Sequence, residues 1–179
     1  YEEVRDFFYR RNNHIEALDR AAETLFEQQG FSIDDLEPGL TEYPKQQHNI
    51  KVKLSSFEER RSLQKHYDAA SRTLYLAKPS SPARRAFHIA HQIALLVYPD
   101  LIQQELEDAE LVSNQAQAIC RVGLANYFAG ALLMPYSQFL NNARRLRYDI
   151  GCLSGLYGTS FEKVCHRLST MPRPGDEGV

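Results

Sequence analysis

Two histidines three residues apart, His88 and His91, come closest in this sequence to a catalytic motif. A zinc peptidase helix carries His-Glu-x-x-His, in which the histidines bind the metal and the glutamate deprotonates the bound water. In that register the chain has His91, Gln92 and Leu95. A glutamine cannot accept a proton at neutral pH, and a leucine cannot bind a metal. The motif therefore predicts a peptidase-like helix that has lost its chemistry.

The helix that must position these histidines is predicted to end at Val97. Ser81 is a suitable N-cap, and Pro82 fits the first helical position, where its missing N–H costs nothing. Apolar residues recur at three- and four-residue steps on most sides of the segment. This pattern is typical of a buried helix at the centre of a domain.

Around this helix, the hydrophobic period predicts several helices and three short strands. Residues 31–48, with Pro38, Gly39 and Pro44, are predicted to be a connector. Capping boxes are expected at Asn13 and Thr159. The helices are predicted at 1–11 (or an arm), 15–29, 101–111, 114–134, 150–157 and 161–168, and the strands at 50–54, 63–67 and 73–77. The expected fold class is α+β, mostly helical, with a small three-stranded antiparallel sheet packed on a degenerate zincin-like helix.

Glycines interrupt the long helix predicted at 114–134. Gly123 and Gly130 each weaken such a helix by up to ~1 kcal/mol. Their presence indicates either a close helix–helix approach or room left for a ligand.

The composition predicts one globular domain with a sizeable core. The chain has 179 residues, of which 43% are hydrophobic and 25% charged. No apolar run approaches the ~20 residues that span a bilayer, and no signal peptide or initiator Met is visible, so we expect a cytoplasmic fragment of a longer protein. Within it we expect an N-terminal arm and helix (1–30), a core (31–171) and a tail or linker (172–179).

The three cysteines form no CxxC pair, which argues against a disulfide framework or a structural zinc site.

Charge is unevenly distributed. Residues 45–85 hold ten Lys or Arg against three acids, whereas residues 16–42 hold eight acids against one Arg. A local basic field beside acidic helices favours a phosphorylated small molecule over a long nucleic acid, although a solvated basic surface explains it equally well. Arg20 either pairs with the acids along its helix, which we favour, or points into a site.

Four blocks in order resemble the ImmA/IrrE-type metallopeptidase family. They are residues 67–76, 85–91, Ala125–Pro135, which is similar to the family pattern ANxFAAxLLMP, and Gly158–Leu168, which is similar to GVSFExVxxRL. Active members also carry an acidic metal ligand just before the Ala-Asn pair, where this chain has Val122, Gly123 and Leu124. The resemblance therefore implies the family's fold without zinc and without an enzymatic activity.

Within the family, the Tyr9–Asn13 opening and the His91-Gln92 pair resemble one branch in particular. This branch comprises actinobacterial transcriptional regulators of short-chain fatty acid metabolism, such as the mycobacterial regulators of propionate metabolism. The resemblance implies a domain that senses a short-chain acyl-CoA, with promoter DNA bound by a helix-turn-helix domain outside these residues. An iron–sulfur cluster is implied only outside these residues. We further expect a homo-oligomer and no membrane partner.

Coenzyme A would need cations for its phosphates and a dry pocket for its acyl group. We expect the pocket at the vacated metal site, with Tyr98 as a lid. The candidate ligand-binding residues are Arg11, Arg20, Lys53, Arg72, Phe87, His91, Tyr98, Leu124, Tyr127 and Phe128. The alternative function is a zinc metallopeptidase with atypical ligands at His88, His91 and Gln92. We disfavour a third function, DNA binding by the last two helices, because their faces are largely apolar.

Overall fold

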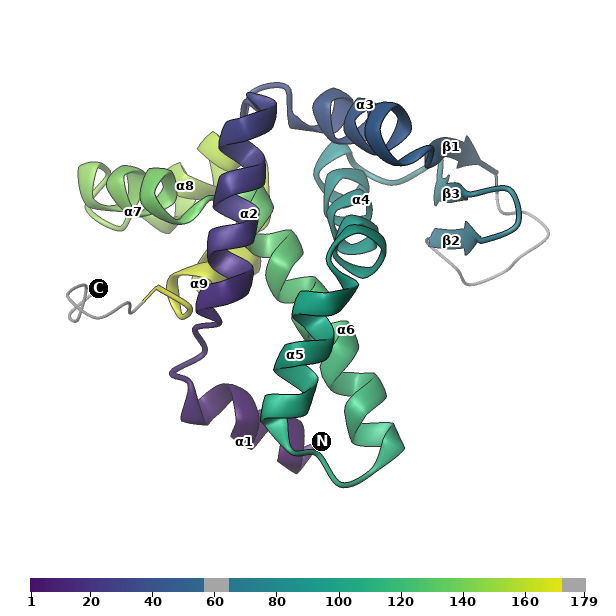
Figure 1. Cartoon of the computed structure of the whole chain (residues 1–179). Helices are drawn as coiled ribbons and strands as arrows, with labels where there is room; N and C mark the ends of the chain where they lie inside the picture. The colour runs from purple at the N-terminus through teal and green to yellow at the C-terminus, as the bar shows by residue number, and fades with distance from the viewer. Residues whose placement is uncertain (57–64, 172–179) are drawn as a thin grey trace.

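Two helices cross at the centre of the fold, α4 (Pro82–Val97) and α6 (Asn114–Leu133) (Figure 1). The structure is a computed structural model that describes residues 1–56 and 65–171. The other described helices are α1 (Glu2–Arg10), α2 (Glu16–Gln29), α3 (Leu36–His48), α5 (Pro99–Ala109), α7 (Tyr136–Arg145), α8 (Ile150–Tyr157) and α9 (Phe161–Leu168). The strands are β1 (Lys51–Ser55), β2 (Lys65–Asp68) and β3 (Thr73–Ala77). The expected mostly helical fold with a small sheet is confirmed.

The sheet is mixed, and the prediction of an antiparallel sheet was wrong in this detail. Its strand order is β1-β3-β2, with β1 parallel and β2 antiparallel to β3. The chain passes from β1 to the far edge of the sheet, and the β2–β3 hairpin then returns β3 to the middle. The hairpin turn is stabilised by Asp68, which accepts hydrogen bonds from the Ala70 N–H and the Ser71 hydroxyl. The predicted start of the second strand, at residue 63, lies outside the described residues.

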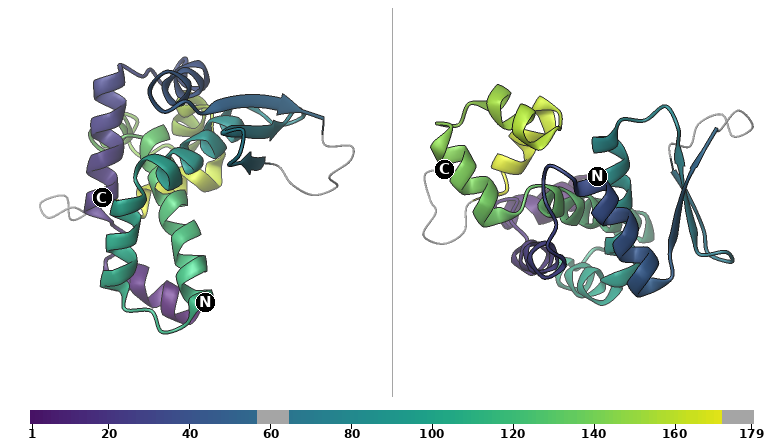
Figure 2. Two further views of the ribbon diagram at one scale, coloured as in Figure 1. Left: turned by 45° about the vertical axis from the view of Figure 1, so that its right-hand side comes forward. Right: turned by 90° about the horizontal axis from the view of Figure 1, so that it is seen from above.

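In the part of the chain that the structure describes, the buried side chains form two hydrophobic cores. The larger core is built mainly from α2, α4, α5 and α6, and buries Leu18, Ile93 and Phe128. The smaller one joins α7, α8 and α9 through Phe139, Leu153 and Val164. The right-hand view of Figure 2 shows α7–α9 at one side of the molecule and the sheet at the opposite side, with α2, α4, α5 and α6 between them. The expected packing of the last two helices into a core is therefore observed.

Several local predictions were wrong. Residues 36–48 form α3, although we expected a connector; Pro38 is tolerated because it lies in the first turn, where the helix needs no N–H donor. Ile15 precedes α2 without a side-chain cap, so Asn13 forms no capping box. At α9 the cap is Ser160, whose hydroxyl accepts from the Lys163 N–H at 3.2 Å, one residue later than predicted.

The N-cap predicted for α4 is confirmed, because the Ser81 hydroxyl accepts a hydrogen bond from the Arg84 N–H at 3.2 Å. Of the cysteines, only Cys120 is buried.

Among the described helices, none alone has the length and apolar character to cross a membrane, and the bent pair α6 and α7 meets these criteria by length and composition only.

Candidate functional site

A cavity of about 480 Å³ lies where α4, α6 and α9 meet, between the two hydrophobic cores. We call the buried part of its lining the floor; it contains the apolar Leu133 and Met134 together with the polar Tyr127, Arg167 and Thr170. Its mouth is formed by more exposed side chains, among them Arg84 on α4 and Lys163 on α9. This size suits a small ligand or the inner part of a larger one.

Contacts between α4 and α9 form one wall of the cavity. The Lys163 ammonium lies 3.4 Å from the centroid of the Phe87 ring, a cation–π contact between the two helices. Burial lowers the pKa of Lys163, and Glu162 at the cavity mouth opposes that shift. Neither Arg84 nor Lys163 belongs to an ion pair within the described part of the chain. The cavity mouth therefore presents two cations that are available to an anion.

His88 and His91 are neutral at physiological pH. Burial is the main cause that lowers the pKa of each to about 4, and the nearby positive charge of Lys65 adds to the shift. Arg84 and Lys163 also lower the pKa of His88. The positive charges near α4 therefore disfavour a further proton there.

The vacated catalytic register is filled by packing and hydrogen bonding. His91 Nδ1 donates to Asn126 Oδ1 at 2.8 Å, so Asn126 links the histidine to the cavity wall. Gln92 is buried and Leu95 is half-buried against the larger core. Within residues 1–56 and 65–171, no three His, Cys, Asp or Glu side chains gather as a metal site requires.

A buried ion pair at the cavity joins α2 to α9, and its arginine, Arg167, is one of the lining residues. The Arg167 guanidinium donates to both carboxylate oxygens of Asp19, at 2.7 and 3.1 Å. The Tyr127 hydroxyl also donates to Asp19, and Arg167 reaches the Met134 carbonyl at 2.9 Å. Burial raises the pKa of Asp19, but Arg167 and these hydrogen bonds outweigh it, so the pKa of this carboxyl lies below its usual value.

Sequence reasoning missed these two residues as partners, although one signal was present. Asp19 follows Leu18 on the apolar stripe of its helix, where a charged residue indicates a buried partner. Nothing comparable marked Lys163, because a single lysine on a short helix is ordinary.

Some of the predicted site residues lie at the cavity. Phe87 and Tyr127 line it, and His91 is one hydrogen bond away through Asn126. The others of the apolar set lie deeper: Leu124 and Phe128 are fully buried in the larger core. Tyr98 packs against Phe128, with ring centroids 5.0 Å apart.

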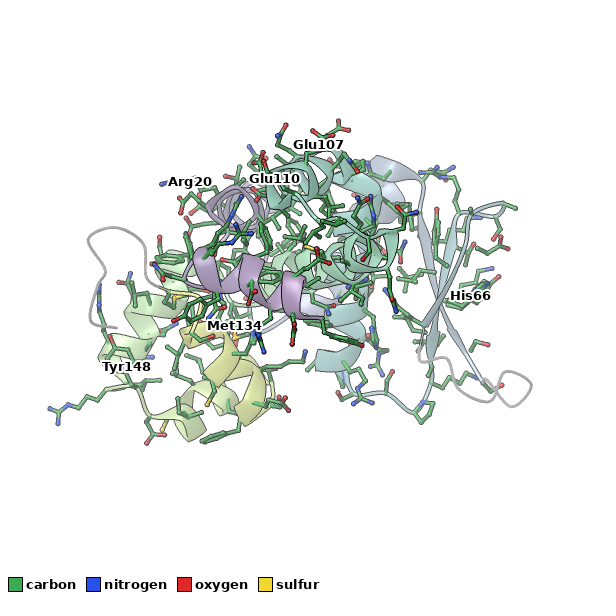
Figure 3. The ribbon with its side chains drawn as sticks, turned by 90° about the horizontal axis from the view of Figure 1, so that it is seen from below. Arg20, His66, Glu107, Glu110, Met134 and Tyr148 are labelled. Atoms are coloured by element: carbon green, nitrogen blue, oxygen red, sulfur yellow. The ribbon has the colours of Figure 1, made fainter. Side chains whose placement is uncertain are left out.

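The four predicted cations lie elsewhere. Arg11 forms an ion pair with Glu105, and Arg72 donates to the carbonyls of residues 48 and 49. Arg20 is paired with Glu16 along α2, as we favoured, and Figure 3 shows it projecting from the outer edge of the molecule. Lys53 is exposed on β1. The structure does not bring these four together.

Comparison with known proteins identifies related domains. The family model described as the IrrE N-terminal-like domain (Peptidase M78) matches residues 45–169. Across its whole length, the chain is 42% identical to the HTH-type transcriptional regulator PrpR and 38% identical to the HTH-type transcriptional regulator RamB, both from Mycobacterium tuberculosis. It is also 38% identical to a propionyl-CoA carboxylase regulator from Cereibacter sphaeroides.

A solved structure, described as a Mycobacterium tuberculosis transcriptional regulator, has the same fold. Its TM-score is 0.95 at 42% sequence identity, over 99% of this chain and 54% of the solved one. The chain spans only 37% of PrpR and 38% of RamB. The similarity therefore covers one part of longer regulatory proteins.

Proposed function

This chain belongs to the IrrE N-terminal-like domain family, and from that premise we propose that it is a non-catalytic ligand-sensing domain of a transcriptional regulator, with a short-chain acyl-CoA as its ligand. The named relatives support the regulatory part, since PrpR and RamB are transcriptional regulators by name. The Cereibacter relative is named for propionyl-CoA carboxylase, which favours a ligand related to propionyl-CoA.

The observation that carries the proposal is the cavity between α4 and α9. An acyl-CoA has a polyanionic nucleotide at one end and an apolar acyl group at the other. The cavity has the complementary arrangement, with Arg84 and Lys163 at its mouth and Leu133 and Met134 in its floor. The acyl group and pantetheine arm would enter the cavity, while the phosphates would remain at the cationic mouth.

Residues of the lost peptidase motif support a binding role over a catalytic one. Gln92 occupies the position of the general base, and Leu95 that of the second metal ligand. In the proposed regulator, a separate helix-turn-helix domain binds promoter DNA, and the chain acts as a homo-oligomer. Binding of the ligand shifts the equilibrium between two arrangements of the protein.

The mouth cations provide the test. We expect Arg84→Ala and Lys163→Ala each to weaken propionyl-CoA binding by about 1–3 kcal/mol, roughly 5- to 150-fold, because each removes a charge-assisted contact to a phosphate. Isothermal titration calorimetry of the purified chain and its variants measures this loss.

Arg20→Ala and Lys53→Ala are matched controls, because each removes the same type of cation from an exposed position away from the cavity. They should bind like the unsubstituted chain. If they lose affinity and the two mouth variants do not, the phosphates bind elsewhere and the cavity assignment is wrong.

A further inference from the structure

The two glycines of α6 have different surroundings. A Cβ atom at Gly123 would lie 3.3 Å from the Phe8 ring, so this glycine permits the close approach of α1. A Cβ atom at Gly130 would meet nothing within 4 Å, and Gly130 lines the cavity. The sequence suggested that a glycine in this helix allows either a close helix–helix approach or room for a ligand. Gly123 fits the first explanation, and Gly130 fits the second.

Nothing in the backbone requires a glycine at position 130. It lies inside α6, and its φ is not among the positive values found in the described residues. Glycine in a helix interior is less favourable than alanine, because it loses more conformational freedom on folding. The missing side chain therefore costs stability, and what it provides is volume inside the cavity.

The position of Gly130 relates this volume to one end of the ligand. It lies one turn before Leu133 and Met134, the apolar floor residues, whereas the cations Arg84 and Lys163 are at the mouth. A ligand that leaves its phosphates at the mouth would bring its acyl end to this floor. Extra side-chain atoms at position 130 would then compete with the last carbons of the acyl chain.

We propose that Gly130 is a specificity-determining residue that sets the longest acyl chain the cavity admits. This inference rests on the proposed function, acyl-CoA binding in the cavity between α4 and α9. It predicts that a larger residue at position 130 discriminates against longer acyl groups while sparing shorter ones.

Calorimetric titration of Gly130→Ala and Gly130→Leu with acetyl-, propionyl- and butyryl-CoA tests the inference. In Gly130→Leu, butyryl-CoA affinity should fall roughly 10- to 200-fold relative to acetyl-CoA affinity, since one or two carbons in a filled pocket have effects of this size. Gly130→Ala should shift the same ratio less. Both variants should keep or raise the melting temperature, because alanine and leucine are better helix formers than glycine.

Gly155 offers a matched control. It lies in α8 and is exposed, and a Cβ atom there would also meet nothing within 4 Å, but it does not line the cavity. Gly155→Leu should leave the acyl-chain preference unchanged. An unchanged preference in Gly130→Leu would overturn the inference while acyl-CoA sensing stands. If the unsubstituted chain binds none of the three thioesters, the proposed function fails, and this inference fails with it.

Discussion

His91 lies in the register of a zinc-peptidase motif, and its surroundings are those of a buried structural residue. Its ring is buried, its pKa is lowered to about 4, and its Nδ1 donates to Asn126 rather than orienting toward an acid. The histidine is hydrogen-bonded to the wall residue Asn126 and carries no charge near neutral pH. At the scale of the residue, the site is therefore electrostatically suited to an anion because of Arg84 and Lys163, and not because of its histidines.

The lowered pKa of His91 predicts a pH-dependent stability. Between pH 6.5 and about 4, the unfolded chain binds a proton on this histidine that the folded chain does not, so the free energy of unfolding falls as the pH decreases. Urea denaturation at pH 7, 5.5 and 4.5 should show a shallower fall in His91→Gln than in the unsubstituted chain. Equal slopes in the two proteins would contradict the assignment. Glu105 is common to both proteins, whereas His88, whose pKa His91 helps to lower, contributes to the difference between them.

Part of the candidate site was predictable from sequence, and part was not. Phe87 and Tyr127 lie on helices whose period fixes which face is apolar, so the expectation that they approach a common pocket agrees with the structure. The hydrophobic period gives no comparable information on which cationic side chains lie close together in the fold. The described cations of the basic stretch 45–85 are distributed over α3, the sheet, the segments beside it and the start of α4. Of these described cations only Arg84 lines the cavity, where Lys163 joins it from almost 80 residues away along the chain.

At the scale of the elements, α9 is held in place by a buried charge pair in addition to its apolar packing against α7 and α8. Arg167 is the buried link from α9 to Asp19 on α2, and Val164 packs into the smaller core. Since α9 also carries Lys163, the ion pair positions one of the cations at the cavity mouth. Such a pair is costly to break, because the remaining charge stays buried without a partner.

We expect Asp19→Asn to lower the free energy of unfolding by about 3–5 kcal/mol, because it leaves the Arg167 guanidinium buried without its counter-charge. Urea denaturation at pH 7 measures the loss. Asp108→Asn is the control: its partly exposed carboxylate is 3.9 Å from Arg11, and its loss should change stability by about 1 kcal/mol or less. Similar losses in the two variants would show that the Asp19–Arg167 pair has no special role.

Elements with strong local signals were predicted well, and those set by tertiary contacts were not. The caps and apolar stripes of α4 and α6 are local, and their bounds agree with the structure to within a residue or two. α3 was missed because Pro38, Gly39 and Pro44 are typical of a loop. It forms because Leu40 and Tyr43 pack into the larger core. Gly39 is suited to this helix because a Cβ atom at that position would lie only 3.0 Å from the Phe31 side chain. The strand order was also beyond local signals, because periodicity identifies strands but not their neighbours.

At the scale of the whole molecule, the cavity lies between two separately packed cores. Lys163 comes from α9, which packs into the smaller core, and Arg84 and Phe87 come from α4, which packs into the larger one. A ligand that contacts both would favour the arrangement in which they are close together, which is how binding would be coupled to the rest of a regulator. Because the chain spans little more than a third of its curated relatives, that coupling belongs to the proposal for the longer protein.

The most direct test of the central claim is calorimetric titration of this chain with propionyl-CoA, free CoA and dephospho-CoA. The cations at the mouth and the apolar Leu133 and Met134 in the floor predict the tightest binding for propionyl-CoA. Free CoA should bind more weakly because it lacks the acyl group, and dephospho-CoA more weakly than free CoA because it lacks the 3′-phosphate. Equal dissociation constants for all three would show that neither end of the ligand is recognised as we propose, and no binding of any of them would contradict the sensing function itself.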